Sequence, residues 1–129
     1  MWVALFRGLI PANRMKLYIY KNCGTCRKAV KYLESNGIEI DAIPIRDQPP
    51  TKTELKKMLK IYDGELKKLF NTSGQDYRAL GMKDSLPSMR VDEAIKLLSE
   101  NGNLIKRPFL LTDNSGAVGF REAEWQSLF

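Results

Sequence analysis

A chain of 129 residues has the length of a single domain with its own core, and it is too short for two such domains. Its apolar fraction of 43% and charged fraction of 28% are ordinary for a globular protein, and no apolar run approaches the roughly 20 residues of a membrane-spanning helix. The net charge of +6 is interleaved with acidic residues along the chain, without an arginine-rich block. This pattern predicts a solvated basic surface, with attraction of small anions as the alternative, and it disfavours direct binding to nucleic acid.

The N-terminal segment 1–14 has a short apolar stretch but lacks the basic start of a signal peptide. We predict that it is a disordered extension, derived from an upstream start codon or from added sequence. The domain is then expected to span 15–129. Because no secretion signal is recognised, we expect a cytoplasmic protein with reduced thiols.

The first elements of the domain follow in a strand, helix, strand order. A β-rich run at 16–20 precedes a helix whose apolar residues recur at helical spacing and which ends at an Asn-Gly pair. Asn22 is the predicted cap of this helix. A second strand is expected at 38–45, where Pro44 marks the end of the strand or an edge of the sheet.

A helical insert is predicted at about 51–102. Thr51 and Glu54 have the spacing of a capping box, and an apolar stripe follows them. A short helix is expected at 65–70 and a longer one at 91–100, which a second Asn-Gly pair ends.

The chain closes with two strands and a helix. Strands are expected at 109–112 and 117–120, joined by an Asp-Asn-Ser-Gly turn, and residues 121–129 form the last helix. The order is therefore β-α-β, a helical insert, and β-β-α. This order predicts an α/β fold, a thioredoxin-like mixed sheet of about four strands with helices on both faces.

The cysteines of the chain are Cys23 and Cys26, in a C-x-x-C motif between the first strand and its helix. Free N–H groups and the dipole at a helix N-terminus favour a thiolate there, so Cys23 is the candidate nucleophile. Cys26 would lie on the same helix face, partly covered, as the candidate resolving thiol. Gly24 lets other groups approach the backbone closely, and Arg27 adds positive charge.

The chain has no histidine, so backbone groups, hydroxyls and cations must activate the thiol. Two cysteines without histidine are too few ligands for a structural zinc site, and no metal is expected. Farther along, Pro108 opens a predicted strand and is a candidate cis-proline that faces the cysteine motif. Arg107 directly before it is a candidate for holding an anion near Cys23 by paired hydrogen bonds.

Four separated motifs resemble the ArsC/Spx family of arsenate reductase-like proteins. They are CGTCRKA, FNTSGQDYRALGM, LIKRPFLL and VGF, which occur in this order between residues 23 and 120. The middle motif is most similar to the arsenate-reductase-like branch and less similar to Spx itself. The resemblance covers nearly the whole chain from Met15 onward, and it implies a thioredoxin-like fold with a helical insertion.

The resemblance also implies site residues. The catalytic cysteine of the family falls on Cys23, and one of three anion-binding arginines falls on Arg107. The second arginine position is occupied by Asn71, and the third lies near Phe120 or Arg121. This replacement disfavours arsenate turnover, and a cysteine at 26, where the arsenate enzymes often have serine, favours disulfide chemistry.

Two functions follow from the resemblance. The first is a thiol-dependent oxidoreductase that acts on a small oxyanion or a disulfide, with electrons from glutathione or from a dithiol protein such as glutaredoxin or thioredoxin, and with no tightly bound cofactor. The alternative is a Spx-like redox-sensing regulator that binds RNA polymerase. The residues expected to contact substrate are Asn22, Gly24, Thr25, Arg27, Asn71 and Pro108.

Overall fold

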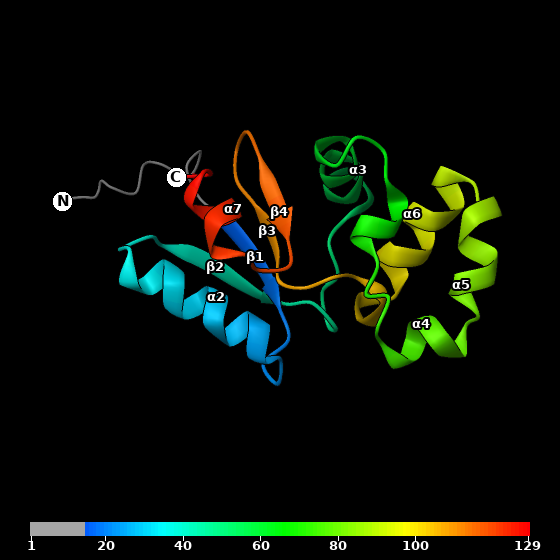
Figure 1. Ribbon diagram of the computed structural model, residues 1–129, viewed down its shortest axis with the longest axis horizontal. Helices are drawn as coiled ribbons and strands as arrows, with labels where there is room; N and C mark the ends of the chain where they lie inside the picture. The colour runs from blue at the N-terminus through cyan, green and yellow to red at the C-terminus, as the bar shows by residue number, and fades with distance from the viewer. Residues whose placement is uncertain (1–14) are drawn as a thin grey trace.

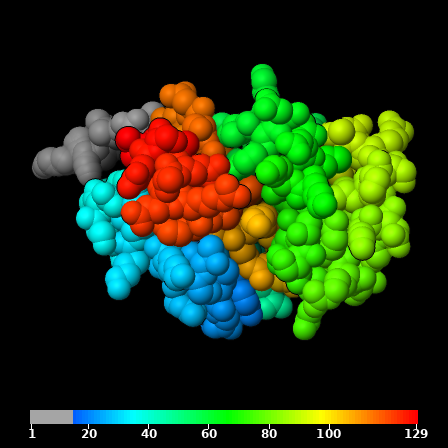
Figure 2. Space-filling model, in the orientation of Figure 1, coloured from blue at the N-terminus to red at the C-terminus, as the bar shows by residue number. Residues whose placement is uncertain are grey.

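The computed structural model describes residues 15–129. The predicted extension 1–14 lies outside the described residues. A sheet with two helices on one face forms one side of the molecule, and the helical insert forms the other (Figure 1). In the space-filling view the insert, green to yellow, is packed directly against the sheet side (Figure 2). Within the described part, no helix is both long and apolar enough to cross a membrane.

The sheet contains four strands, β1 (Met15–Ile19), β2 (Ile40–Pro44), β3 (Phe109–Leu111) and β4 (Gly116–Val118). Their order is β2-β1-β3-β4, with β1 and β2 parallel and the other pairs antiparallel. A parallel pair joined by a helix, followed by an antiparallel hairpin, makes the mixed sheet that the element order predicts. The α/β, thioredoxin-like fold class is confirmed.

Alternate residues of each strand face different cores, as the pleat of a strand requires. Leu17 of β1 is paired with Leu110 of β3, and both face the helices α2 (Gly24–Ser35) and α7 (Glu122–Gln126). The neighbouring pair, Tyr18 and Phe109, faces the insert with ring centroids 5.8 Å apart. The α2–α7 core consists of Leu17, Ala29, Leu33, Leu110, Ala117 and Trp125.

The insert covers the opposite face with short helices. Its elements are α3 (Lys52–Ile61), η2 (Leu66–Leu69), α4 (Gln75–Ala79), α5 (Met82–Ser85), η3 (Leu86–Ser88), α6 (Val91–Glu100) and η4 (Gly102–Leu104). Their apolar side chains form one core with the sheet, which includes the stripe Leu55, Met58 and Leu59 predicted for the first of these helices. Burial of each such side chain contributes about 1.5–3 kcal/mol, so the insert is an integral part of the domain.

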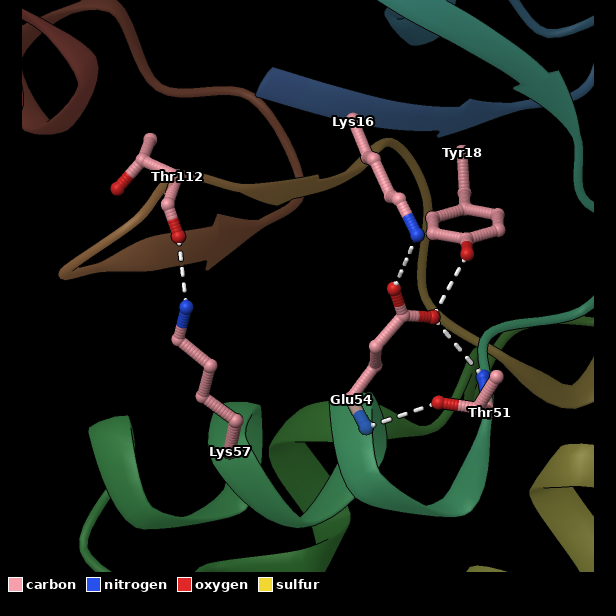
Figure 3. Close-up of polar contacts among 6 residues, drawn as sticks. All are labelled: Lys16, Tyr18, Thr51, Glu54, Lys57 and Thr112. Atoms are coloured by element: carbon pink, nitrogen blue, oxygen red, sulfur yellow. Dashed lines mark hydrogen bonds and ion pairs between the residues drawn. The ribbon is translucent and has the colours of Figure 1, made fainter. Parts of the chain in front are cut away.

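Glu54 joins the first turn of α3 to β1 (Figure 3). Its carboxylate accepts hydrogen bonds from Lys16 Nζ at 2.9 Å, the Tyr18 hydroxyl at 2.7 Å and the Thr51 N–H at 3.0 Å. The Thr51 hydroxyl accepts the Glu54 N–H in return, at 3.2 Å. The predicted capping box is confirmed, and its carboxylate also holds the insert against the sheet.

Later residues of the same helix, together with its C-cap Tyr62, hold the β3–β4 hairpin. Lys57 Nζ donates to the carbonyl oxygens of Thr112 at 2.7 Å and Asp113 at 3.0 Å, the first of which is drawn in Figure 3. The hydroxyl of Tyr62 accepts the Val118 N–H at 3.0 Å. These contacts fix the hairpin beside the insert, where the segment after β4 becomes a wall of the site.

Most predicted boundaries move by one or two residues. The helix predicted at 91–100 coincides with α6, whereas the short helix predicted at 65–70 is the 3₁₀ turn η2. The strand predicted at 117–120 ends earlier, at Val118. Gly119 follows with φ +74°, a left-handed conformation that leaves the strand and suits glycine.

Candidate active site

Cys23 is itself the N-cap of α2. Its N–H donates to the Tyr20 carbonyl oxygen at 3.0 Å, and its Sγ accepts the N–H of Cys26 at 3.4 Å. The prediction that Asn22 caps this helix is wrong, because Asn22 lies one residue before the cap. Its exposed side chain turns away and donates to the Tyr20 hydroxyl at 3.3 Å. At the N-terminus of α2, a free backbone N–H group therefore donates to the Cys23 sulfur.

The pKa of the Cys23 thiol is lowered. Partial burial opposes its ionisation, but hydrogen bonds from the Cys26 backbone, the Cys26 thiol and the Thr25 backbone outweigh that effect. The positive charge of Arg107 acts in the same direction. Donors at a helix N-terminus stabilise the thiolate, which is the nucleophilic form of cysteine.

Cys26 has the opposite character. Its side chain is 1% exposed, and burial raises its pKa to about 12, with the nearby Cys23 acting in the same direction. The pair thus holds one thiol whose pKa is lowered and one whose pKa is raised. A nucleophile and a resolving thiol would require such a difference, and these two roles stay a prediction.

Cys23 opens into a cavity of about 680 Å³, which we call the thiol cavity. Three other predicted site residues, Thr25, Asn71 and Arg107, line it as well. In Figure 2 the segment before β3, yellow-orange, is recessed between the orange and red C-terminal segment and the green insert. Pro108 is buried beside Arg107, and the peptide bond between them is cis, as predicted.

Four predicted contact residues do not line this cavity: Asn22, Gly24, Arg27 and Pro108. Gly24 is exposed, and a side chain there would meet only the Arg27 guanidinium, at 3.9 Å. Arg27 is also exposed, and its Nη1 donates to the Lys21 carbonyl oxygen at 3.1 Å. These two residues and Asn22 shape the loop that carries Cys23, and the cavity wall is formed by others.

Arg107 has an unused donor. Its Nη1 is buried and has no hydrogen-bond partner within residues 15–129. Its guanidinium lies over the ring of Tyr20, 5.2 Å from the centroid. A buried N–H without a partner is costly, and Arg107 also lines the thiol cavity, so it is a candidate for binding an anion there. The residue predicted to hold an anion is therefore beside Cys23 with donor capacity free.

The cavity wall contains cations that the sequence did not single out. Lys67 and Lys68 come from η2, and Lys106 precedes Arg107. Phe120 and Arg121, between which the third anion-binding position was left open, both line the cavity. The other charged wall residues are Glu65 and Glu124, so positive charge is in excess. The adjacent pair Lys67 and Lys68 was the only sign of these cations in the sequence. Whether the pair reaches the cavity depends on how η2 packs.

A second cavity, of about 770 Å³, lies where the carboxyl ends of β1 and β2 meet the insert. Its charged lining residues are Lys21, Arg46, Asp47, Asp76 and Glu100, and Tyr20 belongs to its wall. No group of three or more His, Cys, Asp or Glu side chains in 15–129 is arranged to hold a metal ion.

A thioredoxin-like sheet with an activated cysteine at the N-terminus of its first helix defines a thiol protein of the thioredoxin-like class. The chain belongs to the ArsC family, whose family model matches residues 18–128. The uncharacterized protein YusI of Bacillus subtilis (strain 168) is 46% identical over 112 residues, covering 87% of this chain and 95% of that protein.

Solved structures that are similar to this chain support the same family. The crystal structure of an ArsC family related protein from Bacteroides fragilis has a TM-score of 0.85 at 41% identity and covers 92% of this chain and 99% of its own. A possible arsenate reductase from Streptococcus mutans UA159 has a TM-score of 0.83 at 42% identity, with coverage of 91% and 99%. Regulators are related too: the global transcriptional regulator Spx 2 of Bacillus anthracis is 27% identical over 84% of this chain and 81% of its own length.

Proposed function

We propose that this protein is a thiol-dependent oxidoreductase that reduces a small anionic disulfide. The observation that carries the proposal is the union of two groups in the thiol cavity: a cysteine whose pKa is lowered and an arginine with a buried, unpartnered donor. A cavity of about 680 Å³ lies within the usual range for small-molecule sites, and its basic wall suits a substrate with carboxylates.

The reaction begins with attack of the Cys23 thiolate on one sulfur of the substrate disulfide. The new S–S bond forms as the substrate bond breaks, and the departing thiolate takes up a proton. Cys26 stays protonated in the free protein, so it is released for attack only when a leaving thiolate accepts its proton. Its attack on Cys23 frees the second product thiol and leaves a Cys23–Cys26 disulfide.

Two glutathione molecules, or one dithiol protein such as glutaredoxin or thioredoxin, then return the disulfide to two thiols. The cycle moves two electrons and requires no tightly bound cofactor. It belongs to a reducing compartment, and we assign it to the cytoplasm. Disulfide is favoured over arsenate as substrate because Asn71 supplies neutral donors where the arsenate enzymes have an arginine.

The test compares two matched variants, Cys23→Ser and Cys26→Ser, with glutathione and a mixed disulfide of glutathione and a small thiol. Cys23→Ser is expected to lose all turnover, and Cys26→Ser to keep part of it because glutathione can resolve the mixed disulfide at Cys23. Arsenate in place of the disulfide is expected to give little product. Turnover by Cys23→Ser equal to wild type would contradict the proposal.

Similarity to the Spx regulators supports a second candidate, a redox-sensing regulator that binds RNA polymerase. In that case the Cys23–Cys26 pair is a switch, and catalysis is absent. A pull-down with the polymerase α subunit, with and without oxidant, tests this alternative. Redox-dependent capture together with no turnover of any disulfide would favour it over the enzyme.

A further inference from the structure

Tyr20 stands between the sheet and the cysteine motif. It follows the last residue of β1, and its carbonyl oxygen accepts the Cys23 N–H. Its side chain is half-buried and packs on the core beneath the insert. The backbone of Tyr20 thus already helps to place the nucleophile, while its ring is free to serve another group.

Two guanidinium groups lie over this ring. That of Arg107 is 5.2 Å from the ring centroid, and that of Arg46 is 4.9 Å from it. Arg107 lines the thiol cavity, whereas Arg46 and Tyr20 line the second cavity. A guanidinium within about 6 Å of an aromatic face is attracted to the π-electrons of the ring.

The ring is held in place by its hydroxyl. Arg46 Nη1 donates to the Tyr20 oxygen at 3.0 Å, and Asn22 Nδ2 donates at 3.3 Å. The Asn22 hydrogen bond, with the nearby Arg46 and Arg107, lowers the pKa of the hydroxyl. With its oxygen bound by two donors, the ring presents a fixed face to Arg107.

An aromatic face is a suitable support for an anion-binding arginine. A carboxylate partner would occupy the in-plane N–H donors of the guanidinium and neutralise its charge. The contact with Tyr20 brings no carboxylate to the guanidinium, so the positive charge of Arg107 is left uncompensated. This explains how Arg107 can be anchored while its buried Nη1 remains without a partner in the described residues.

We propose that Tyr20 is a positioning residue that holds the Arg107 guanidinium at the thiol cavity with its donors available for an anion. Asn22 and Arg46 act one step farther away, since they fix the ring. The inference rests on the proposed anion-holding role of Arg107. It gives Asn22, a predicted contact residue that lies outside the cavity, an indirect part in the site.

The experiment uses Tyr20→Leu, Tyr20→Phe, Arg107→Gln and the double variant Tyr20→Leu/Arg107→Gln. Two quantities are measured on each: the pKa of Cys23, from thiolate absorbance, and the sulfate concentration that half-protects Cys23 from alkylation. Sulfate is the probe because it is an unreactive divalent anion. Circular dichroism establishes that each variant is folded, and Tyr20→Phe, which keeps the ring, is the conservative variant.

Tyr20→Leu is expected to raise the half-protecting sulfate concentration roughly threefold to tenfold, and Tyr20→Phe by less than about twofold. Tyr20→Leu should also raise the Cys23 pKa toward its value in Arg107→Gln. In the Arg107→Gln background it should change neither quantity, because a positioning residue acts only through the group that it positions.

Equal effects of Tyr20→Leu in both backgrounds would overturn the inference, since they would indicate a general structural role. Unchanged values in folded Tyr20→Leu would overturn it as well. Failure of the proposed function is a separate result: wild type that sulfate does not protect refutes the anion role of Arg107, and the Cys23 pKa in the four variants then decides whether Tyr20 positions Arg107.

Discussion

The loop after β1 contributes a wall to each of the two cavities, with Cys23 and Thr25 on one and Tyr20 and Lys21 on the other. The two cavities are similar in volume, at about 770 Å³ and about 680 Å³. Its charged lining is three carboxylates and two cations, and the thiol cavity has two carboxylates, five cations and a nucleophile. Volume does not distinguish the two cavities, whereas charge and a thiol with a lowered pKa favour the thiol cavity as the candidate site.

The largest effect is expected from the two arginines over Tyr20, one on each cavity. Arg107→Gln should raise the sulfate concentration that half-protects Cys23 at least about tenfold, because a charge-assisted contact to the anion is lost. Arg46→Gln removes the same charge from the second cavity and should change the half-protecting sulfate concentration less than about threefold. Equal effects of the two variants would break the distinction between the cavities.

An intermediate effect is expected at Glu54, which holds the insert that walls both cavities. Glu54→Gln should lower the free energy of unfolding by about 2 kcal/mol at pH 7, because three donors lose a carboxylate. Burial opposes the charge of Glu54, but hydrogen bonds led by that from Lys16 lower its pKa below the usual value.

The sign of the pH dependence follows from that shift. A carboxyl whose pKa is lower in the folded state stabilises the fold above its unfolded pKa of about 4.3, and the stabilisation is lost as the pH falls through the folded value. The stability difference between wild type and Glu54→Gln should therefore be full at pH 7 and shrink below about pH 4 in urea titrations. A difference independent of pH would show that the charge of Glu54 is not involved.

The smallest effect is expected at Cys26, and it concerns the thiol cavity alone. The Cys26 thiol donates to Cys23 and helps to lower its pKa. Cys26→Ala should move the midpoint of Cys23 alkylation against pH upward, whereas Cys26→Ser should leave it nearly unchanged because a hydroxyl also donates. Identical midpoints in the two variants would show that the backbone donors and Arg107, without the Cys26 thiol, lower the pKa of Cys23.

The sequence was sufficient where the signal is local. The capping box of Thr51 and Glu54 and the extent of α6 were predicted correctly, since short-range patterns determine them. The placement of Cys23 at a helix N-terminus followed from the strand and helix on either side of the motif. The cap itself was misassigned to Asn22, because asparagine is the better cap by propensity and the turn continues for one residue more.

The rest of the site depends on tertiary packing. Lys67 and Lys68 reach the thiol cavity only because η2 packs against the segment 104–108 that precedes β3. There the Asn71 N–H donates to the Leu104 carbonyl oxygen at 2.7 Å. The cation–π contact of Arg107 with Tyr20 joins residues that are 87 positions apart in the sequence. No spacing rule within one sequence predicts such a contact.

The sulfur cap of α2 has a consequence for either function. Once Cys23 is alkylated or enters a disulfide, its sulfur carries no negative charge and is a poor acceptor, so the Cys26 N–H that now donates to it loses its partner. Under either proposed function, we expect oxidation of Cys23 to remove this cap and reduction to restore it. The amide hydrogen of Cys26 should exchange with solvent faster in the oxidised protein. Its exchange rate would then report the redox state of Cys23.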